Sequence, residues 1–256
     1  MDILHSIILG IIEGTTEFLP ISSTGHLILA SDLLGLEAND FIKSFEISIQ
    51  AGAILAVVVF YWRQLLLDRD IAKKVAVAFV PTGVIGFVLY KTVKSFLLGS
   101  TALVLWALVL GGVVLILFEI WDRGREHGIK GLHAITYKQA FLVGVAQSVS
   151  LVPGISRAAA TIIGGLGAGL DRKTIVEFSF LLAVPTMLAA GGYDLLQSAH
   201  VFSWSDFGLL SVGFAVSFIT AIFAVRFFLY YIQRRSFVIF GAYRVVLAFI
   251  FWYFIF

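Results

Sequence analysis

The feature that most constrains this chain is a series of long apolar stretches. Six are long enough to cross a bilayer, which takes about 20 residues at about 1.5 Å per residue. They lie near residues 43–62, 72–91, 101–121, 174–194, 207–230 and 237–255. Only 13% of the residues are charged and 60% are hydrophobic, too little polar surface for a water-soluble fold. The sequence therefore predicts an all-α integral membrane protein with one membrane domain, residues 1–256.

Composition also excludes several functional classes. The formal net charge is only +2, so nothing indicates a nucleic-acid partner. Cysteine is absent, which excludes disulfides and thiol chemistry. The first apolar run follows Asp2 and lacks a basic leader and a small-residue cleavage site, so we expect no removable signal peptide.

A polar break interrupts the first apolar region, near the N-terminus. A helix over residues 3–18 would reach only about 24 Å, because Pro20 biases the preceding residue out of the helical region. The hydroxyls of the "SST" that follows can cap a second short helix over residues 24–34. This pair of helices is too short to cross the bilayer twice.

The same arrangement recurs in the second half of the chain. The run "TYKQAFLVGVAQSVSLV" stops at Pro153-Gly154, and Ser156 can cap a helix that ends near Gly169. Two short helices around a polar break are typical of a re-entrant hairpin, which is tolerated where protein or water satisfies the exposed backbone. The sequence thus predicts six transmembrane helices and two re-entrant helical hairpins.

Basic residues gather in the loops on one side of the predicted spans. They are Arg63, Arg69, Lys73, Lys74, Arg123, Arg125, Lys130, Lys138, Arg172, Lys173, Arg226, Arg234 and Arg235. The other side carries Lys43, Lys91 and Lys94 together with Asp2, Asp32, Glu37, Asp40, Asp194 and Asp206. The positive-inside rule places the basic side in the cytoplasm, so we expect both termini outside the cell membrane.

The two halves of the chain resemble each other. "LGIIEGTTEFLPIS" from Leu9 aligns with "VGVAQSVSLVPGIS" from Val143, and "SFEISIQAGAILA" aligns with "EFSFLLAVPTMLA" further on. The aligned pairs include Gly10 with Gly144, Glu13 with Gln147, and Ser22 with Ser156. Each repeat would consist of one hairpin and three spans. Because three is an odd number of crossings, the second repeat enters the membrane from the opposite face. We expect inverted repeats over about residues 1–125 and 126–256, with the hairpin tips meeting near mid-membrane.

Polar side chains of both hairpins would then face one centre. They are Glu13, Glu17, Ser22, Ser23, Thr24 and His26 from the first hairpin, and Ser156, Arg157 and Thr161 from the second. Ionisable groups inside a membrane cost about 2.5 to 3.5 kcal/mol each, so a functional role is the default. A purely structural tie between the glutamates and Arg157 would leave the cluster of hydroxyls unexplained.

This centre is suited to binding phosphate. Each hairpin presents the N-terminus of its second helix, whose free N–H groups favour anions, and Arg157 can grip two phosphate oxygens. Glu13 and Glu17 are one turn apart and would repel each other without a cation. Mg²⁺ or Ca²⁺ bound by both is one solution, and a protonated glutamate in proton transfer is another.

Ser23 or His26 is available as a nucleophile for phosphoryl transfer, with a carboxylate or the imidazole as base. Helix capping by the serines and a structural role for His26 remain as alternatives. Arg244 lies inside the last span and needs a carboxylate, a carbonyl or the cavity as partner, either structurally or as a second phosphate ligand. The small residues of "GGLGAG" from Gly164 indicate close helix packing.

Two stretches resemble the signatures of a known family, the undecaprenyl-diphosphate phosphatases of the bacitracin-resistance type. "EGTTEFLPISSTGH", residues 13–26, is similar to their glutamate-rich signature. "PGISRAAAT" is similar to their second signature, with Ala158 where a serine is usual. The likeness extends through "EFSFLLAVPTM" to the "YR" at Tyr243 and Arg244.

The resemblance implies an integral membrane hydrolase that converts undecaprenyl diphosphate to the monophosphate and recycles this carrier lipid for cell-wall synthesis. It also implies dependence on Mg²⁺ or Ca²⁺, a site that opens to the outside, and bacitracin resistance on overproduction. The implied essential positions are Glu13, Glu17, Ser23, His26 and Arg157, with Ser22, Thr24, Ser156 and Thr161 lining the site.

Two other classes remain as alternatives. Inverted repeats with broken helices are a transporter architecture, so a secondary transporter or lipid flippase would use the same site. An intramembrane serine protease using Ser23 and His26 would leave the paired glutamates and Arg157 without a role. The expected partners are a polyprenyl diphosphate and bilayer lipids, and a homodimer is left open.

Overall fold

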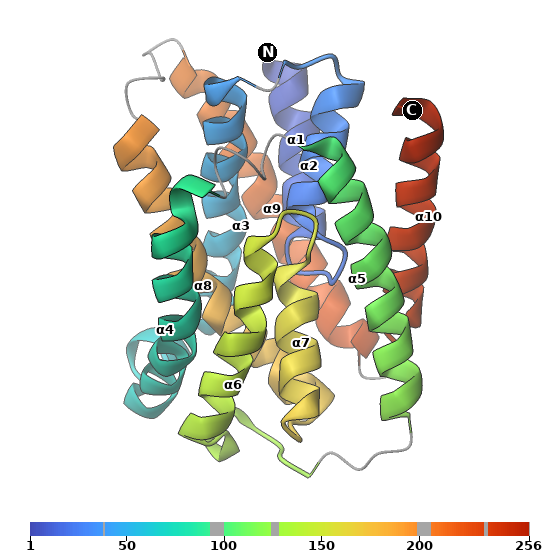
Figure 1. Ribbon diagram of the computed structural model, residues 1–256. Helices are drawn as coiled ribbons and strands as arrows, with labels where there is room; N and C mark the ends of the chain where they lie inside the picture. The colour runs from blue at the N-terminus through green and yellow to red at the C-terminus, as the bar shows by residue number, and fades with distance from the viewer. Residues whose placement is uncertain (38, 93–99, 124–127, 199–205, 233–234, 256) are drawn as a thin grey trace.

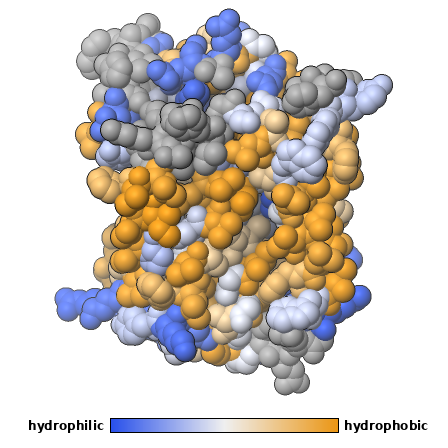
Figure 2. Space-filling view, in the orientation of Figure 1, coloured by the Kyte–Doolittle hydropathy of each residue, from blue (hydrophilic) through white to orange (hydrophobic). Residues whose placement is uncertain are grey.

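The structure, a computed structural model, describes residues 1–37, 39–92, 100–123, 128–198, 206–232 and 235–255. Within these ranges the regular secondary structure is helical, apart from an isolated bridge between Ile129 and Leu170. On the face that Figure 2 shows, hydrophobic residues cover the middle and hydrophilic residues lie toward the two ends. The expected all-α membrane architecture is confirmed at this level.

Six long helices form the body of the bundle. They are α3 (Asp40–Leu66), α4 (Arg69–Thr92), α5 (Thr101–Asp122), α8 (Arg172–Ser198), α9 (Phe207–Ile232) and α10 (Val238–Ile255). Among the described residues, five helices are long and apolar enough to cross a membrane, namely α3, α4, α5, α8 and α9. The remaining predicted span corresponds to α10, which has 18 residues.

Four shorter helices form two hairpins, as expected. The first consists of α1 (Ile3–Thr16) and α2 (Ser23–Leu33), and the second of α6 (Tyr137–Ser148) and α7 (Arg157–Gly167). Two short 3₁₀ turns, η2 (Leu132–Ala134) and η3 (Val149–Leu151), flank α6. The hairpins enter the bundle from opposite ends, and their tips meet near its middle (Figure 1).

Side-chain caps fix where the hairpin helices begin. Asp2 and His5 form a capping box at α1, and Thr136 and Gln139 form the equivalent box at α6. The predicted cap Ser156 accepts a bond of 3.2 Å from the N–H of Ala159 and starts α7. Each cap accepts a hydrogen bond from a helix N–H that would otherwise be free, and so stabilises the start of the short helix.

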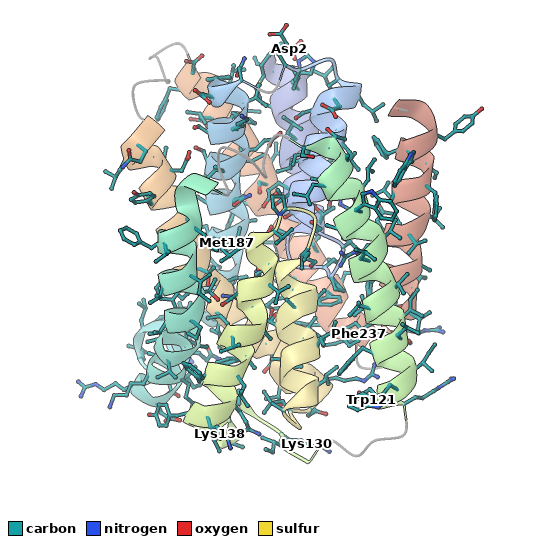
Figure 3. All side chains as sticks on the ribbon, in the orientation of Figure 1. Asp2, Trp121, Lys130, Lys138, Met187 and Phe237 are labelled. Atoms are coloured by element: carbon teal, nitrogen blue, oxygen red, sulfur yellow. The ribbon has the colours of Figure 1, made fainter. Side chains whose placement is uncertain are left out.

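The two ends of the bundle carry different labelled charges, with Asp2 at one end and two lysines at the other (Figure 3). Helix α1 begins and α10 ends at the same end (Figure 1), whereas Lys130 and Lys138 lie at the end opposite Asp2 (Figure 3). Three residues of the predicted charge pattern, Lys94, Arg125 and Arg234, lie outside the described residues.

The two hairpins pack against the bundle in equivalent ways. Helix α1 packs on α9 and α6 packs on α4, while α5 packs on α10. Glycines allow the close approach, because a Cβ on Gly144 would lie 1.9 Å from the carbonyl oxygen of Ala78. Between α6 and α7, a Cβ on Gly164 would lie 2.4 Å from that of Ala146, so the packing interpretation of "GGLGAG" is confirmed.

We expect Gly144→Ala to destabilise the protein by about 1–3 kcal/mol or more, because the added methyl group would overlap the backbone of α4. Thermal unfolding of the purified protein in detergent should show a lower midpoint. Gly167→Ala is the matched control, since a Cβ there meets nothing within 4 Å. An unchanged midpoint for Gly144→Ala would contradict the close approach of α6 and α4.

Candidate functional site

The tip of the first hairpin places a hydroxyl against a carboxylate. Helix α1 ends at Thr16, and Ser22 then adopts φ +72°, a conformation that costs a non-glycine residue about 1–3 kcal/mol. This strained residue caps α2, so that Ser23 becomes its first residue. The hydroxyl of Ser23 donates a short hydrogen bond to Oε2 of Glu17.

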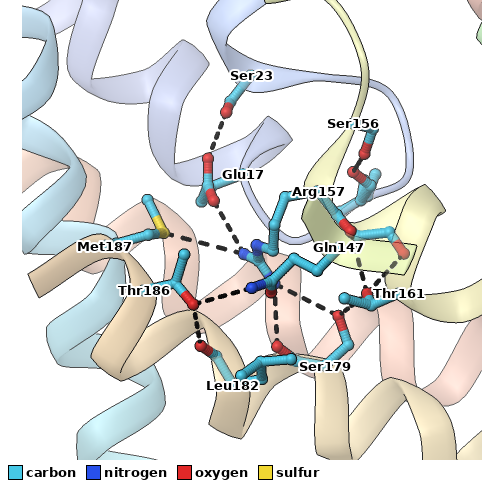
Figure 4. Close-up of polar contacts among 12 residues, drawn as sticks. Glu17, Ser23, Gln147, Ser156, Arg157, Thr161, Ser179, Leu182, Thr186 and Met187 are labelled. Atoms are coloured by element: carbon cyan, nitrogen blue, oxygen red, sulfur yellow. Dashed lines mark hydrogen bonds and ion pairs between the residues drawn. The ribbon is translucent and has the colours of Figure 1, made fainter. Parts of the chain in front are cut away.

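The tip of the second hairpin brings a guanidinium to the same carboxylate. The turn passes through Gly154 at φ +91°, and Arg157 is the first residue of α7. Its Nη2 lies 2.9 Å from Oε1 of Glu17, and both side chains are nearly buried (Figure 4). The two tips also touch through Ser156, whose hydroxyl lies 3.5 Å from the carbonyl oxygen of Leu19. The expected meeting of the hairpin tips is therefore observed.

A serine of α8 holds the other side of Arg157. Nη1 of Arg157 donates to the carbonyl oxygen of Ser179 at 3.0 Å and to its hydroxyl at 3.3 Å. That hydroxyl also lies 2.6 Å from Oγ1 of Thr161, on the next turn of α7. Nη2 contacts the sulfur of Met187 at 3.9 Å (Figure 4). The guanidinium is thus fixed by both hairpins and by α8.

Glu13 lies one turn before Glu17 and is fully buried. In the part of the chain that the structure describes, neither of its carboxylate oxygens has a hydrogen-bond partner. A buried carboxylate without a partner is costly, so Glu13 needs a proton or a cation. No group of three or more His, Cys, Asp or Glu side chains that could hold a metal ion forms within the described ranges.

His26 makes its hydrogen bonds to groups other than this carboxylate pair. Its Nδ1 lies 2.7 Å from the carbonyl oxygen of Ser22, and its Nε2 lies 2.8 Å from the hydroxyl of Tyr243. The two rings stack, with centroids 5.5 Å apart and planes 5° apart. A carbonyl only accepts, so Nδ1 carries the proton and, in the neutral imidazole, Nε2 accepts from Tyr243. The lone pair of His26 is therefore engaged by a tyrosine of α10.

The structure thus brings most of the predicted site residues together. Glu17, Ser23, Arg157 and Thr161 belong to one network, and Glu13 lies one turn before Glu17. Ser156 caps α7 next to this network and contacts the carbonyl oxygen of Leu19. Ser22 caps α2, and Thr24 lies half-buried at the start of the same helix. His26 is on α2 as well but bonds to Ser22 and Tyr243.

Arg244 holds both hairpin turns through backbone carbonyls. It is fully buried and donates to the carbonyl oxygens of Gly154 and Ala107, each at 3.1 Å, and to that of Pro20 at 3.4 Å. Pro20 lies in the first turn and Gly154 in the second. Of the partners considered from the sequence, the backbone carbonyl is the observed one.

Three residues in or beside this network were not predicted from the sequence, namely Ser179, Gln147 and Tyr243. Gln147 donates to Thr82 at 3.0 Å and to Thr186 at 3.1 Å. A signal existed for two of them, because the repeat alignment pairs Gln147 with Glu13 and Ser179 with Glu46. In both aligned pairs, a polar residue of the second half and a polar residue of the first half stand at the same place in otherwise apolar segments. Tyr243 gave no such signal beyond its place next to Arg244.

The chain is similar to known proteins over nearly its whole length. Residues 6–250 match the family described as Bacitracin resistance protein BacA. The chain is 51% identical to the undecaprenyl-diphosphatase of Wolinella succinogenes over 100% of its own length and 99% of that protein. It is 50% identical to that of a Sulfurihydrogenibium species, covering 99% and 100%, and 47% identical to that of Aquifex aeolicus, covering 96% of each.

Loss of the Tyr243 hydroxyl should expose Nε2 of His26 to electrophiles. We expect Tyr243→Phe to raise the rate at which diethyl pyrocarbonate acylates His26 about fivefold, the equivalent of one hydrogen bond of about 1 kcal/mol. Peptide mapping by mass spectrometry would isolate this histidine from the others. Tyr253→Phe, at an exposed position of the same helix, should leave the rate unchanged. Equal rates in both variants would contradict the assigned tautomer.

Proposed function

The chain belongs to the bacitracin resistance protein BacA family, and we propose that the two hairpin tips form its catalytic centre. The protein is a multi-pass membrane phosphatase, an undecaprenyl-diphosphatase that converts undecaprenyl diphosphate to undecaprenyl monophosphate and phosphate. The observation that carries the assignment of the centre is the chain of contacts from Arg157 through Glu17 to Ser23. It joins an anion-binding group, a base and a nucleophile.

The diphosphate is bound by Arg157 and by the two helix N-termini at the tips. The first N–H groups of α2 and α7 lack partners within their own helices and favour an anion. In the described region, Nε of Arg157 is buried and has no hydrogen-bond partner, so it is available to a phosphate oxygen. Ser22, Thr24, Ser156 and Thr161 line this position. Ala158, which is buried, offers no hydroxyl to the substrate.

Ser23 is the nucleophile and Glu17 its base. Ser23 already donates to Glu17, so its proton can pass to the carboxylate as Oγ attacks the terminal phosphorus. The new Oγ–P bond replaces the bond to undecaprenyl monophosphate, which leaves with the proton. Water then cleaves the Oγ–P bond and releases phosphate. His26 is the alternative nucleophile or base, but its Nε2 would first have to part from Tyr243.

The carboxylate pair fits a divalent cation. Both oxygens of Glu13 are buried without a partner among the described side chains, and hard oxygen ligands suit Mg²⁺ and Ca²⁺. Mg²⁺ in particular is commonly held by one or two carboxylates together with substrate phosphates. Glu13 and Glu17 would hold the ion, which when bound supplies positive charge that offsets the diphosphate. A proton on Glu13 is the competing solution.

The site opens to the outside of the cell membrane, and both termini lie on that side. Supporting this orientation, α1 begins and α10 ends at the bundle end opposite Lys130 and Lys138 (Figures 1 and 3). The positive-inside rule makes the lysine-bearing end cytoplasmic. The six long helices then span the membrane, and each hairpin re-enters from its own face, an arrangement that protein contacts at the tips make tolerable.

The two halves are inverted repeats, over about residues 1–125 and 126–256. The equivalent packing of α1 on α9 and of α6 on α4 supports this division. Transporters are built in the same way, but the names of the relatives favour hydrolysis over a transporter or flippase. The geometry adds that Ser23 and Glu17 are already hydrogen-bonded, which transport alone does not require.

Purified protein in detergent, where no transmembrane gradient exists, should release phosphate from undecaprenyl diphosphate. Arg157→Lys and Glu17→Gln should each lower kcat/KM by about 10²- to 10³-fold, because they remove a bidentate phosphate ligand and a base. Lys138→Gln, exposed at the far end of the bundle, is the control and should match the parent. A transporter would release no phosphate, and full activity in both site variants would refute the site.

Titration with EDTA distinguishes the cation from the protonated glutamate. If Glu13 and Glu17 hold a divalent ion, activity should fall to background in chelator and return on addition of Mg²⁺ or Ca²⁺ in excess. Glu13→Gln should then raise the Mg²⁺ concentration needed for half activity at least about tenfold, the cost of losing about 1.4 kcal/mol of binding. Full activity in chelator would instead assign Glu13 to proton transfer.

A further inference from the structure

An apolar groove lies between α3, α4 and α8, outside the network at the hairpin tips. Its volume is about 690 Å³, within the range of sites for small molecules. Val84 and Phe87 of α4 and Ala189 and Ala190 of α8 line it and are exposed. Nothing in the reaction described above uses these side chains.

One end of the groove adjoins the catalytic centre. Thr82 and Thr186 line it there, and Gln147 of the second hairpin donates to both hydroxyls. Met187, the residue after Thr186, contacts Nη2 of Arg157 (Figure 4). Thr186 in the wall of the groove is therefore next in sequence to a residue that contacts the guanidinium of Arg157.

The groove also has a direction. From Thr186 to Asp194, which also lines it, α8 rises about 12 Å at about 1.5 Å per residue. The carboxylate of Asp194 accepts from Ser44 at 3.0 Å and disfavours an anion at that end. A bound diphosphate belongs at the end next to Arg157, and an apolar chain belongs in the remainder.

We propose that this groove binds the first part of the polyprenyl chain of the substrate, with the rest of the chain in lipid. The inference rests on the proposed catalytic centre, since it needs the diphosphate at Arg157. A chain covalently attached to that diphosphate must leave the centre through an apolar path, and Thr82 and Thr186, at the near end of the groove, are hydrogen-bonded to Gln147 of the second hairpin. The groove thus makes substrate binding depend on the first part of the apolar chain, whereas Arg157 recognises the phosphates alone.

Filling the groove tests the proposal. Ala190→Trp and Val84→Trp narrow it from α8 and from α4, and Val114→Trp adds the same bulk to an exposed position of α5. We expect the two groove variants to raise KM for undecaprenyl diphosphate about tenfold, without a change in kcat, since they remove binding shared by ground and transition states. Their KM for inorganic diphosphate and that of Val114→Trp for the lipid should equal the parent values.

The outcomes separate the two levels of the proposal. If the parent releases no phosphate from either substrate, the proposed function itself fails. If the parent is active and the groove variants match it on undecaprenyl diphosphate, the groove proposal is overturned. An equal rise in KM for both substrates would also overturn it, because the substitutions would then weaken binding of the diphosphate rather than of the polyprenyl chain.

Photolabelling of the unmodified protein keeps the test independent of folding in the variants. Undecaprenyl diphosphate with a diazirine on its first isoprene unit should label peptides containing residues 79–88 and 186–194. Excess unlabelled undecaprenyl diphosphate should remove the label, and excess phosphatidylglycerol should not. Labelling confined to other helices, or displaced equally by phospholipid, would show that the groove holds ordinary membrane lipid.

Discussion

The ion pair between Glu17 and Arg157 is the interaction on which the arrangement of the site depends. Both charges are nearly buried in an apolar bundle, where an unpaired charge would cost several kcal/mol. The pair joins the two hairpins, which are far apart in sequence. Ser23 donates to the second oxygen of Glu17 and Ser179 accepts from Nη1 of Arg157, so each charge is both paired and hydrogen-bonded, while Nε of Arg157 has no hydrogen-bond partner among the described residues. Such a pair gives little net stability, but it specifies how the tips meet.

The hairpins are what make this burial feasible. A continuous helix has no free backbone groups to offer a ligand, whereas a broken one presents N–H groups and polar side chains at the break. Here the breaks lie inside the bundle, so protein rather than lipid surrounds them. The strained φ of Ser22 fits this role, because it turns the chain so that Ser23 starts α2 next to Glu17. A glycine at position 22 would relax the strain but lose the cap that the hydroxyl of Ser22 provides.

Much of this could be predicted from the sequence, because the physical signals are local. The length of the apolar stretches predicted the long helices, and Pro20, Pro153 and the capping serines predicted the hairpins. The Glu17–Arg157 contact followed from the repeat alignment, which placed both tips at one depth. The contact of His26 with Tyr243 could not be found this way, because the repeat alignment relates the two hairpins to each other and not the first hairpin to the last helix. Ser179 was hidden for another reason, because a single serine in an apolar span is compatible with many helix orientations.

Arg244 has a consequence for how the protein is made. This arginine lies on α10 and contributes the donors that hold the turns at Pro20 and Gly154. Synthesis of both hairpins is complete long before α10 emerges from the ribosome. Until that helix inserts, the carbonyl groups of the two turns lack the guanidinium that links them. The arrangement of the hairpin tips is therefore completed late in biosynthesis, so that partial chains in the membrane carry Glu17 and Arg157 without the contacts that Arg244 adds to the two turns.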